Sequence, residues 1–246
     1  MGNYDDALKQ IDFYKLHPSY LPFIGSDYDK YRILHIGESH YCDSMDIEQF
    51  GINYFFKWFD EPCNEVETDL LNNNITRRVA NGIVNNECHF TIFDNVLRSF
   101  IRIMKDEQNP RISNENRKEY KYFAFMNYYP FPAFEPKGNF LQSLRKLSKM
   151  KNNKDETEKL ICKAEYEATN IVDQVIDILN PNCIAFTSCA AWKSYKNKNG
   201  KYVNDERMIY TSHPGKPVSW NKALPILENQ KGIDVFESGL KRIYHK

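Results

Sequence analysis

The stretch that decides the fold reads Arg32-Ile33-Leu34-His35-Ile36-Gly37-Glu38-Ser39-His40-Tyr41. A mostly apolar, partly β-branched run ends at a glycine, and a carboxylate, a hydroxyl, an imidazole and a phenol follow it. This pattern predicts a buried strand that ends at Gly37. Because ligands of open α/β sheets bind outside the carboxyl ends of the strands, the residues after Gly37 are where we expect a site.

Three other short apolar runs also end at polar residues. They are Tyr122–Asn127, Cys183–Ser188 and Met208–Ser212, and the last one leads into His213-Pro214-Gly215-Lys216-Pro217. Helical periodicity lies between the runs, over 46–60, 65–85, 90–105, 138–150, 156–179 and 190–195. Strands that alternate with long helical connections predict an α/β fold with a parallel sheet covered on both faces.

No linker rich in proline, glycine or serine divides the chain of 246 residues, so we expect one domain over 1–246. Residues 1–29 are expected to be a lead-in that packs against the domain. Residues 222–244 are predicted to be mostly helical, with an interruption near Gly232.

The composition narrows the class of protein. Lys+Arg and Asp+Glu balance at 33 each, so the chain has no overall basic field of the kind that marks many nucleic-acid binders. The six cysteines form no CxxC pair, and neither a signal-peptide pattern nor an apolar run of membrane-spanning length is present. We therefore expect a soluble, cytoplasmic monomer with reduced thiols and no membrane contact.

Parallel strands place their carboxyl ends at one edge of a sheet, so residues 37–41, Asn127, Ser188 and His213 are expected to share a cleft. Glu38 is suited to orient or deprotonate a water molecule, and the alternative is a carboxylate that caps the next helix. Asn127 offers an acceptor and a donor, as reading the edge of a pyrimidine requires. Its alternative role is an Asx turn before Pro130.

The segment after the last predicted strand adds two more kinds of group. His213 can stabilise negative charge on a leaving group, although a histidine before proline is more often a plain loop residue. Lys216 and the backbone amides around Gly215 can hold a phosphate, although a loop lysine is usually a solvated charge.

Metal and cysteine chemistry are not expected. His40, Cys42 and Asp43 match no standard zinc spacing, so the sequence predicts no metal and no cofactor. Cys189 precedes a predicted helix but has no histidine close to it in sequence, and we interpret it as a packed thiol.

Taken in order, these motifs resemble those of the uracil-DNA glycosylase superfamily. Its members carry Gly-Gln-Asp-Pro-Tyr or Gly-Glu-Ala-Pro-Gly after the first strand, an asparagine at the end of the second, and a motif like His-Pro-Ser-Pro after the last. The counterparts here are Gly37-Glu38-Ser39-His40-Tyr41, Asn127 in Phe125-Met126-Asn127-Tyr128, and His213-Pro214-Gly215-Lys216. The resemblance extends from Tyr31 to about Trp220.

The resemblance implies a three-layer αβα sandwich around a central four-stranded parallel sheet, with a pocket for a base flipped out of DNA. It implies that the N-glycosidic bond of uracil or another modified base in DNA is hydrolysed without a metal or redox cofactor. Glu38 or Ser39 would hold the attacking water, Asn127 would read the base, and His213 would stabilise the departing base.

Other family positions also have counterparts. Tyr41 and Phe50 are candidates for the ring that stacks on the base, Gly215 and Lys216 stand where the family contacts the DNA backbone, and Trp220 is a candidate for the wedge that fills the vacated stack. The iron–sulfur members have a cysteine quartet whose spacing is absent here, so no cluster is expected.

The chain also departs from the family pattern. Ser39 stands where the best-known members have the catalytic aspartate, and His40 replaces a proline of the water-binding turn. Two alternatives therefore stay open. One is a catalytically inactive member that binds nucleic acid or a protein partner, and the other is a hydrolase of a free nucleoside or nucleotide.

Overall fold

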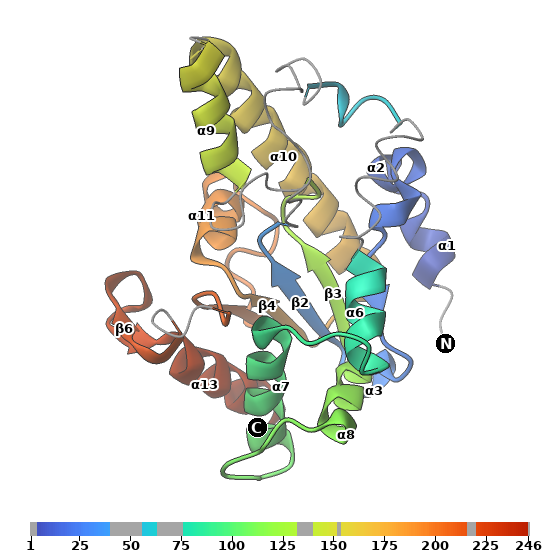
Figure 1. The fold of residues 1–246 in the computed structure, drawn as a ribbon, viewed down its shortest axis with the longest axis vertical. Helices are drawn as coiled ribbons and strands as arrows, with labels where there is room; N and C mark the ends of the chain where they lie inside the picture. The colour runs from blue at the N-terminus through green and yellow to red at the C-terminus, as the bar shows by residue number, and fades with distance from the viewer. Residues whose placement is uncertain are drawn as a thin grey trace.

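The computed structural model describes residues 4–39, 56–62, 76–131, 140–151, 154–215 and 220–245. A five-stranded sheet in the order β1-β3-β2-β4-β5 crosses its centre (Figure 1). The strands are β1 (Phe23–Ile24), β2 (Ile33–Gly37), β3 (Phe123–Asn127), β4 (Cys183–Phe186) and β5 (Met208–Tyr210). β3, β2, β4 and β5 run parallel to one another, which confirms the four predicted strands and their common direction.

The expectation of a purely parallel, four-stranded sheet is wrong, because the lead-in contributes a fifth strand. β1 pairs antiparallel with β3, with Phe23 opposite Phe125. The chain continues alongside β3 beyond β1, and a Cβ on Gly25 would lie 2.1 Å from the carbonyl oxygen of Lys121, so only glycine fits there. A strand of two residues is too short to show an alternation pattern in the sequence. It is recognised as a strand only from its pairing with β3.

Helices cover both faces of the sheet (Figure 1). On one face lie α1 (Tyr4–Leu8), α2 (Asp12–Leu16), α9 (Phe140–Lys151), α10 (Lys154–Leu179) and α11 (Cys189–Asn197); on the other lie α6 (Thr76–Val84), α7 (Thr91–Met104) and α13 (Gly232–Tyr244). Successive residues of β2 alternate between the two cores, with Leu34 and Ile36 in the first and Ile33 in the second. This double burial explains why the strand is a nearly continuous apolar run.

Short elements connect these layers. They are α3 (Tyr28–Tyr31), α8 (Asn114–Arg117) and the 3₁₀ turns η1 (Pro18–Tyr20), η3 (Lys118–Tyr122) and η4 (Pro225–Leu227). Within the described ranges, no helix is both long and apolar enough to cross a membrane.

The helices predicted over 90–105, 138–150, 156–179 and 190–195 are confirmed as α7, α9, α10 and α11. α6 forms the last part of the helix predicted over 65–85, and 46–55 and 65–75 lie outside the described residues.

The prediction for 222–244 is wrong in its first half. β6 (Ala223–Leu224) and β7 (Gln230–Lys231) form an antiparallel hairpin around η4, and the helix begins only at Gly232. Pro225 starts η4, and Glu228 and Asn229 have φ angles of 53° and 62°, which an α-helix does not allow.

Among the described residues, two histidines are buried. His35 of β2 has no exposed surface, and its Nδ1 and Nε2 lie 2.7 Å from the Tyr120 hydroxyl and 2.8 Å from Thr187 Oγ1. The Thr187 hydroxyl donates to the carbonyl of Ile36, so it accepts from Nε2–H and leaves Nδ1 to accept from Tyr120. His17 stacks on the Trp58 ring with centroids 4.4 Å apart, and its Nε2 donates to the Trp58 carbonyl at 2.6 Å.

Both rings are neutral in the folded protein at neutral pH. Burial lowers the pKa of His35 to about 3, with a smaller contribution from the charge of His213. Burial also lowers the pKa of His17 to about 4, against the opposing effect of its bond to Trp58. Protonation of either ring therefore favours the unfolded chain, in which a histidine binds its proton near pH 6.5.

The structure thus predicts a loss of stability in mild acid. As the pH falls below about 6.5, these histidines bind protons in the unfolded chain but not in the folded chain. Each of them therefore lowers the unfolding free energy by about 1.4 kcal/mol per pH unit until the pH reaches its pKa in the folded protein. Urea denaturation at pH 7, 6 and 5 measures this slope. The variant His17→Gln should lose about half of the histidine contribution.

His89, which is exposed, is the matched control, and His89→Gln should keep the full slope. An equal slope in the native protein and in His17→Gln would contradict the assignment of this pH dependence to the buried ring.

Candidate functional site

The carboxyl ends of β2 and β3 lie side by side. Their register places Gly37 opposite Asn127. Beyond the strands the pairing continues, because the backbone N–H groups of Tyr128 and Tyr129 donate to the carbonyl oxygens of Gly37 and Glu38 at 3.0 and 2.9 Å. The two predicted strand ends therefore form one continuous structure.

Gly37 makes room for the side chain of Asn127. A Cβ on Gly37 would lie 2.3 Å from Oδ1 of Asn127, far inside contact distance. Asn127 is only 8% exposed, so its amide is held against the end of β2 rather than free in a loop. The glycine of the motif thus has a packing role, and the asparagine has a defined position.

Glu38 reaches the end of the neighbouring strand β4. The Ser188 hydroxyl donates to Glu38 Oε2 at 2.7 Å. Ser188 is also the N-cap of α11, where its Oγ accepts from the backbone N–H of Ala191 at 3.3 Å. The carboxylate therefore lies near a helix N-terminus, where the helix dipole stabilises negative charge. The helix involved is α11, which is distant in sequence, and the alternative of capping the next helix concerns residues outside the described ranges.

His213 lies in the turn that follows β5. Its Nδ1 accepts from the backbone N–H of Gly215 at 3.0 Å, so in the neutral ring the proton is on Nε2, which is then a hydrogen-bond donor. The turn is tied to α7 because Asn95 Nδ2 donates to the Pro214 carbonyl at 2.7 Å. His213 is also close enough to His35 for its charge to contribute to the lowered pKa of that ring, after the larger effect of burial.

The structure shows two contacts between predicted site residues at the ends of neighbouring strands, and the shared cleft of all of them stays a prediction. Gly37 contacts Asn127, and Glu38 contacts Ser188, while His213 lies on the side of the sheet where His35 is buried. Ser39 directly follows Glu38 and is partly exposed. His40, Tyr41, Phe50 and Lys216 lie outside the described residues, so the stacking ring and the phosphate contact of Lys216 stay predictions.

Two other predicted roles are clarified. Trp220 is 2% exposed and packs against Phe236 of α13 with ring centroids 6.0 Å apart, so it is a core residue and not a surface wedge. Cys189 is partly buried, and burial raises the pKa of its thiol, with a further rise from the charge of Glu38. This thiol is not activated as a nucleophile.

Sequence reasoning missed the role of His35, the polar residue inside an apolar strand. Its partner Thr187 directly precedes Ser188, so the network of His35 and the bond of Glu38 meet at the end of β4. A histidine among Ile33, Leu34 and Ile36 was the available signal, because a polar side chain in a doubly covered strand needs buried partners.

Surface hollows and groups of metal-binding side chains are two further features that can mark a site. Two hollows in the described surface, of about 220 and 290 Å³, lie between β1 and α6 and along β5 and α13, and neither is lined by a predicted site residue. No group of three or more His, Cys, Asp or Glu side chains among the described residues could hold a metal ion.

Comparison with known proteins returns no match: no protein-family model, no curated protein and no solved structure matches this chain. Its function must therefore be argued from its own residues and their geometry.

The contact between Gly37 and Asn127 makes a first prediction about the site. Gly37→Ala should destabilise the protein by about 1–3 kcal/mol, because the new methyl group overpacks the space filled by the Asn127 amide. Urea denaturation of Gly37→Ala, Asn127→Ala and the double variant measures this. In the Asn127→Ala background the alanine at 37 should cost far less, because the clashing group is gone. Additive effects of the two substitutions would contradict the packing argument.

Proposed function

We propose that this protein is a DNA glycosylase of the uracil-DNA glycosylase type, which hydrolyses the N-glycosidic bond of uracil or another modified base. The observation that carries the proposal is the pairing of Gly37, the residue before Glu38, with Asn127 at the ends of two adjacent parallel strands. These residues belong to two of the motifs that resemble those of the family. One motif supplies the carboxylate proposed to hold the water, and the other supplies the amide proposed to read the base. In this proposal the four parallel strands are the family's central sheet, and β1 is an addition at its edge.

Glu38 is proposed to hold the attacking water. Its Oε2 is oriented by Ser188, and its ionised form is favoured by the N-terminus of α11. The carboxylate accepts a proton as the water oxygen bonds to the anomeric carbon of the sugar, and the bond from that carbon to the base nitrogen breaks. Glu38 thereby compensates for Ser39, which stands at the family's aspartate position.

His213 and Asn127 are proposed to act on the base itself. The base leaves with the electron pair of the broken bond and carries negative charge. His213, whose Nδ1 is occupied by Gly215, offers Nε2–H as the donor to that charge. Asn127 is held nearly buried at the end of β3, and its amide supplies both a donor and an acceptor for the edge of the base.

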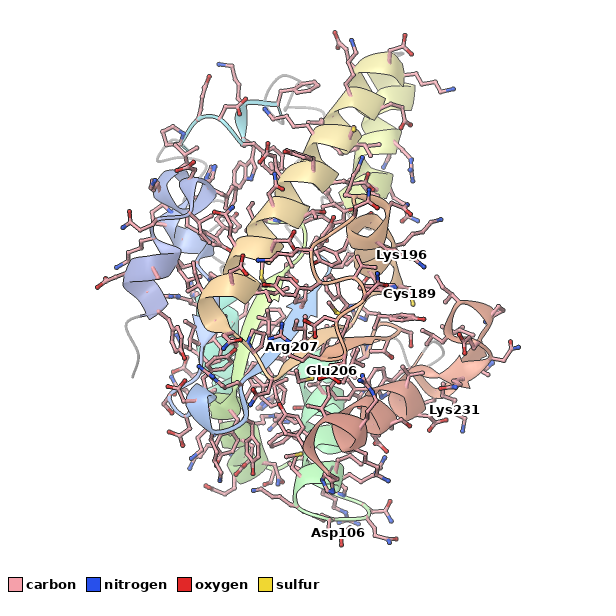
Figure 2. All side chains as sticks on the ribbon, turned by 180° about the vertical axis from the view of Figure 1, so that it is seen from behind. Asp106, Cys189, Lys196, Glu206, Arg207 and Lys231 are labelled. Atoms are coloured by element: carbon pink, nitrogen blue, oxygen red, sulfur yellow. The ribbon has the colours of Figure 1, made fainter. Side chains whose placement is uncertain are left out.

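Local positive charge supports DNA as the substrate of a chain whose net charge is zero. Lys193 and Lys196 are exposed on α11, the helix that starts beside Glu38, and Figure 2 shows Lys196 on the same helix as Cys189. Lys222 is exposed in the segment before β6. Such lysines can neutralise phosphates without setting sequence preference.

The test is an assay for abasic sites with oligonucleotides that carry uracil, hypoxanthine, xanthine or a modified cytosine. The native protein should produce abasic sites in at least one of them. Glu38→Gln should lower the rate by about 10²- to 10⁴-fold, because the amide cannot accept the proton of the water. His213→Gln should lower it by about 10²- to 10³-fold through the loss of charge stabilisation.

The matched control is Glu87→Gln, which changes an exposed carboxylate and should leave the rate unchanged. If no oligonucleotide is cleaved while DNA binding persists, the enzymatic proposal fails and the chain is a binding protein. Cleavage of free nucleosides alone, with little dependence on salt, would indicate a nucleoside hydrolase instead.

A further inference from the structure

A second group of reactive side chains lies away from the candidate site, where α10 and α11 pack against each other (Figure 1). Cys162 and Glu165 are three residues apart on α10 and lie on the same face of the helix. Lys198, at the end of α11, points between them. Its Nζ is 3.2 Å from Cys162 Sγ and 3.4 Å from Glu165 Oε2.

Lys198 is held in this position by a partly buried hydrogen-bond network. The side chains of Lys198 and Glu165 are 23% and 14% exposed. The other carboxylate oxygen of Glu165 accepts from the Ser194 hydroxyl at 2.7 Å, and Ser194 accepts from the Tyr129 hydroxyl at 2.8 Å. Because Glu165 is fixed from behind, the ammonium group that it attracts is fixed beside the sulfur of Cys162.

Cys162 differs from the other cysteines of the described part of the chain. It is exposed, whereas Cys183 is buried and Cys88 and Cys189 are partly buried. Burial raises the pKa of these three thiols, that of Cys183 to about 12. Thiols of this kind contain little thiolate at neutral pH and react slowly.

Lys198 remains an ammonium group in this cluster. Burial by itself would lower its pKa, but the hydrogen bond to Cys162 and the charge of Glu165 outweigh burial and raise the pKa overall. An adjacent ammonium group stabilises a thiolate by charge and by a charge-assisted hydrogen bond. The pair therefore combines an accessible nucleophile with a neighbouring proton donor.

We propose that Cys162 is a modification site at which a hydroperoxide oxidises the thiolate to sulfenic acid, with Lys198 as the proton donor. The sulfur attacks one peroxide oxygen, an S–O bond forms and the O–O bond breaks. The departing hydroxide takes a proton from the Lys198 ammonium, so thiolate, ammonium and hydrogen peroxide become sulfenic acid, amine and water. Sulfur loses two electrons and the peroxide gains them. This proposal does not depend on the glycosylase function.

The test exposes the full chain to hydrogen peroxide in the presence of dimedone, which traps sulfenic acids, and follows each cysteine by mass spectrometry. Cys162 should be labelled at least about ten times faster than Cys88, Cys183 or Cys189, because it is exposed beside an ammonium group, whereas burial raises the pKa of the other three thiols. Lys198→Met should slow the labelling of Cys162 by a similar factor, and Lys198→Arg should retain most of the rate.

Lys196→Met is the matched control, because it removes an exposed charge from the same helix two residues away and should leave the rate unchanged. Equal labelling of Cys162 and Cys189 in the native protein would overturn the proposal, and this comparison needs no variant to fold. An unchanged rate in a folded Lys198→Met, or an equal loss in Lys196→Met, would also overturn it.

Discussion

The pairing of β2 with β3 on one side and β4 on the other is the constraint on which the rest of the structure depends. All five residues of β2 are buried, and both of its edges are hydrogen-bonded. Because parallel strands pair in a fixed register, the position of Gly37 determines where Asn127 lies, and the end of β4 brings Ser188 to Glu38. The candidate site is thus a direct consequence of the central sheet.

His35 adds a polar requirement to this apolar strand. A buried imidazole is costly unless both of its nitrogens have partners, and Tyr120 and Thr187 supply them. Thr187 directly precedes Ser188, whose hydroxyl donates to Glu38. The hydrogen bond that satisfies the buried His35 ring therefore also helps to define the end of β4. Stability in mild acid and the geometry of the site therefore depend on neighbouring parts of one network.

The sequence allowed the four parallel strands and four of the major helices to be predicted, because long elements with one or two buried faces have a clear apolar pattern. It did not reveal β1 or the hairpin of β6 and β7, whose strands have two residues each and exist through their pairing. The same distinction holds at the site. Parallel order was enough to expect Gly37 beside Asn127, whereas the bond from Ser188 to Glu38 and the burial of Trp220 follow from packing between distant segments.

By itself, the sequence determined which residues end the strands and so which chemical groups lie at the carboxyl edge of the sheet: a glutamate, an asparagine, a serine and a histidine. Only the tertiary structure decided how they are held. Gly37 accommodates the amide of Asn127, Gly215 orients His213, and Lys198, the C-cap of α11, lies beside the thiol of Cys162 on α10. The physical reason is that periodicity reports burial along one element, whereas hydrogen bonds between side chains depend on distances between elements.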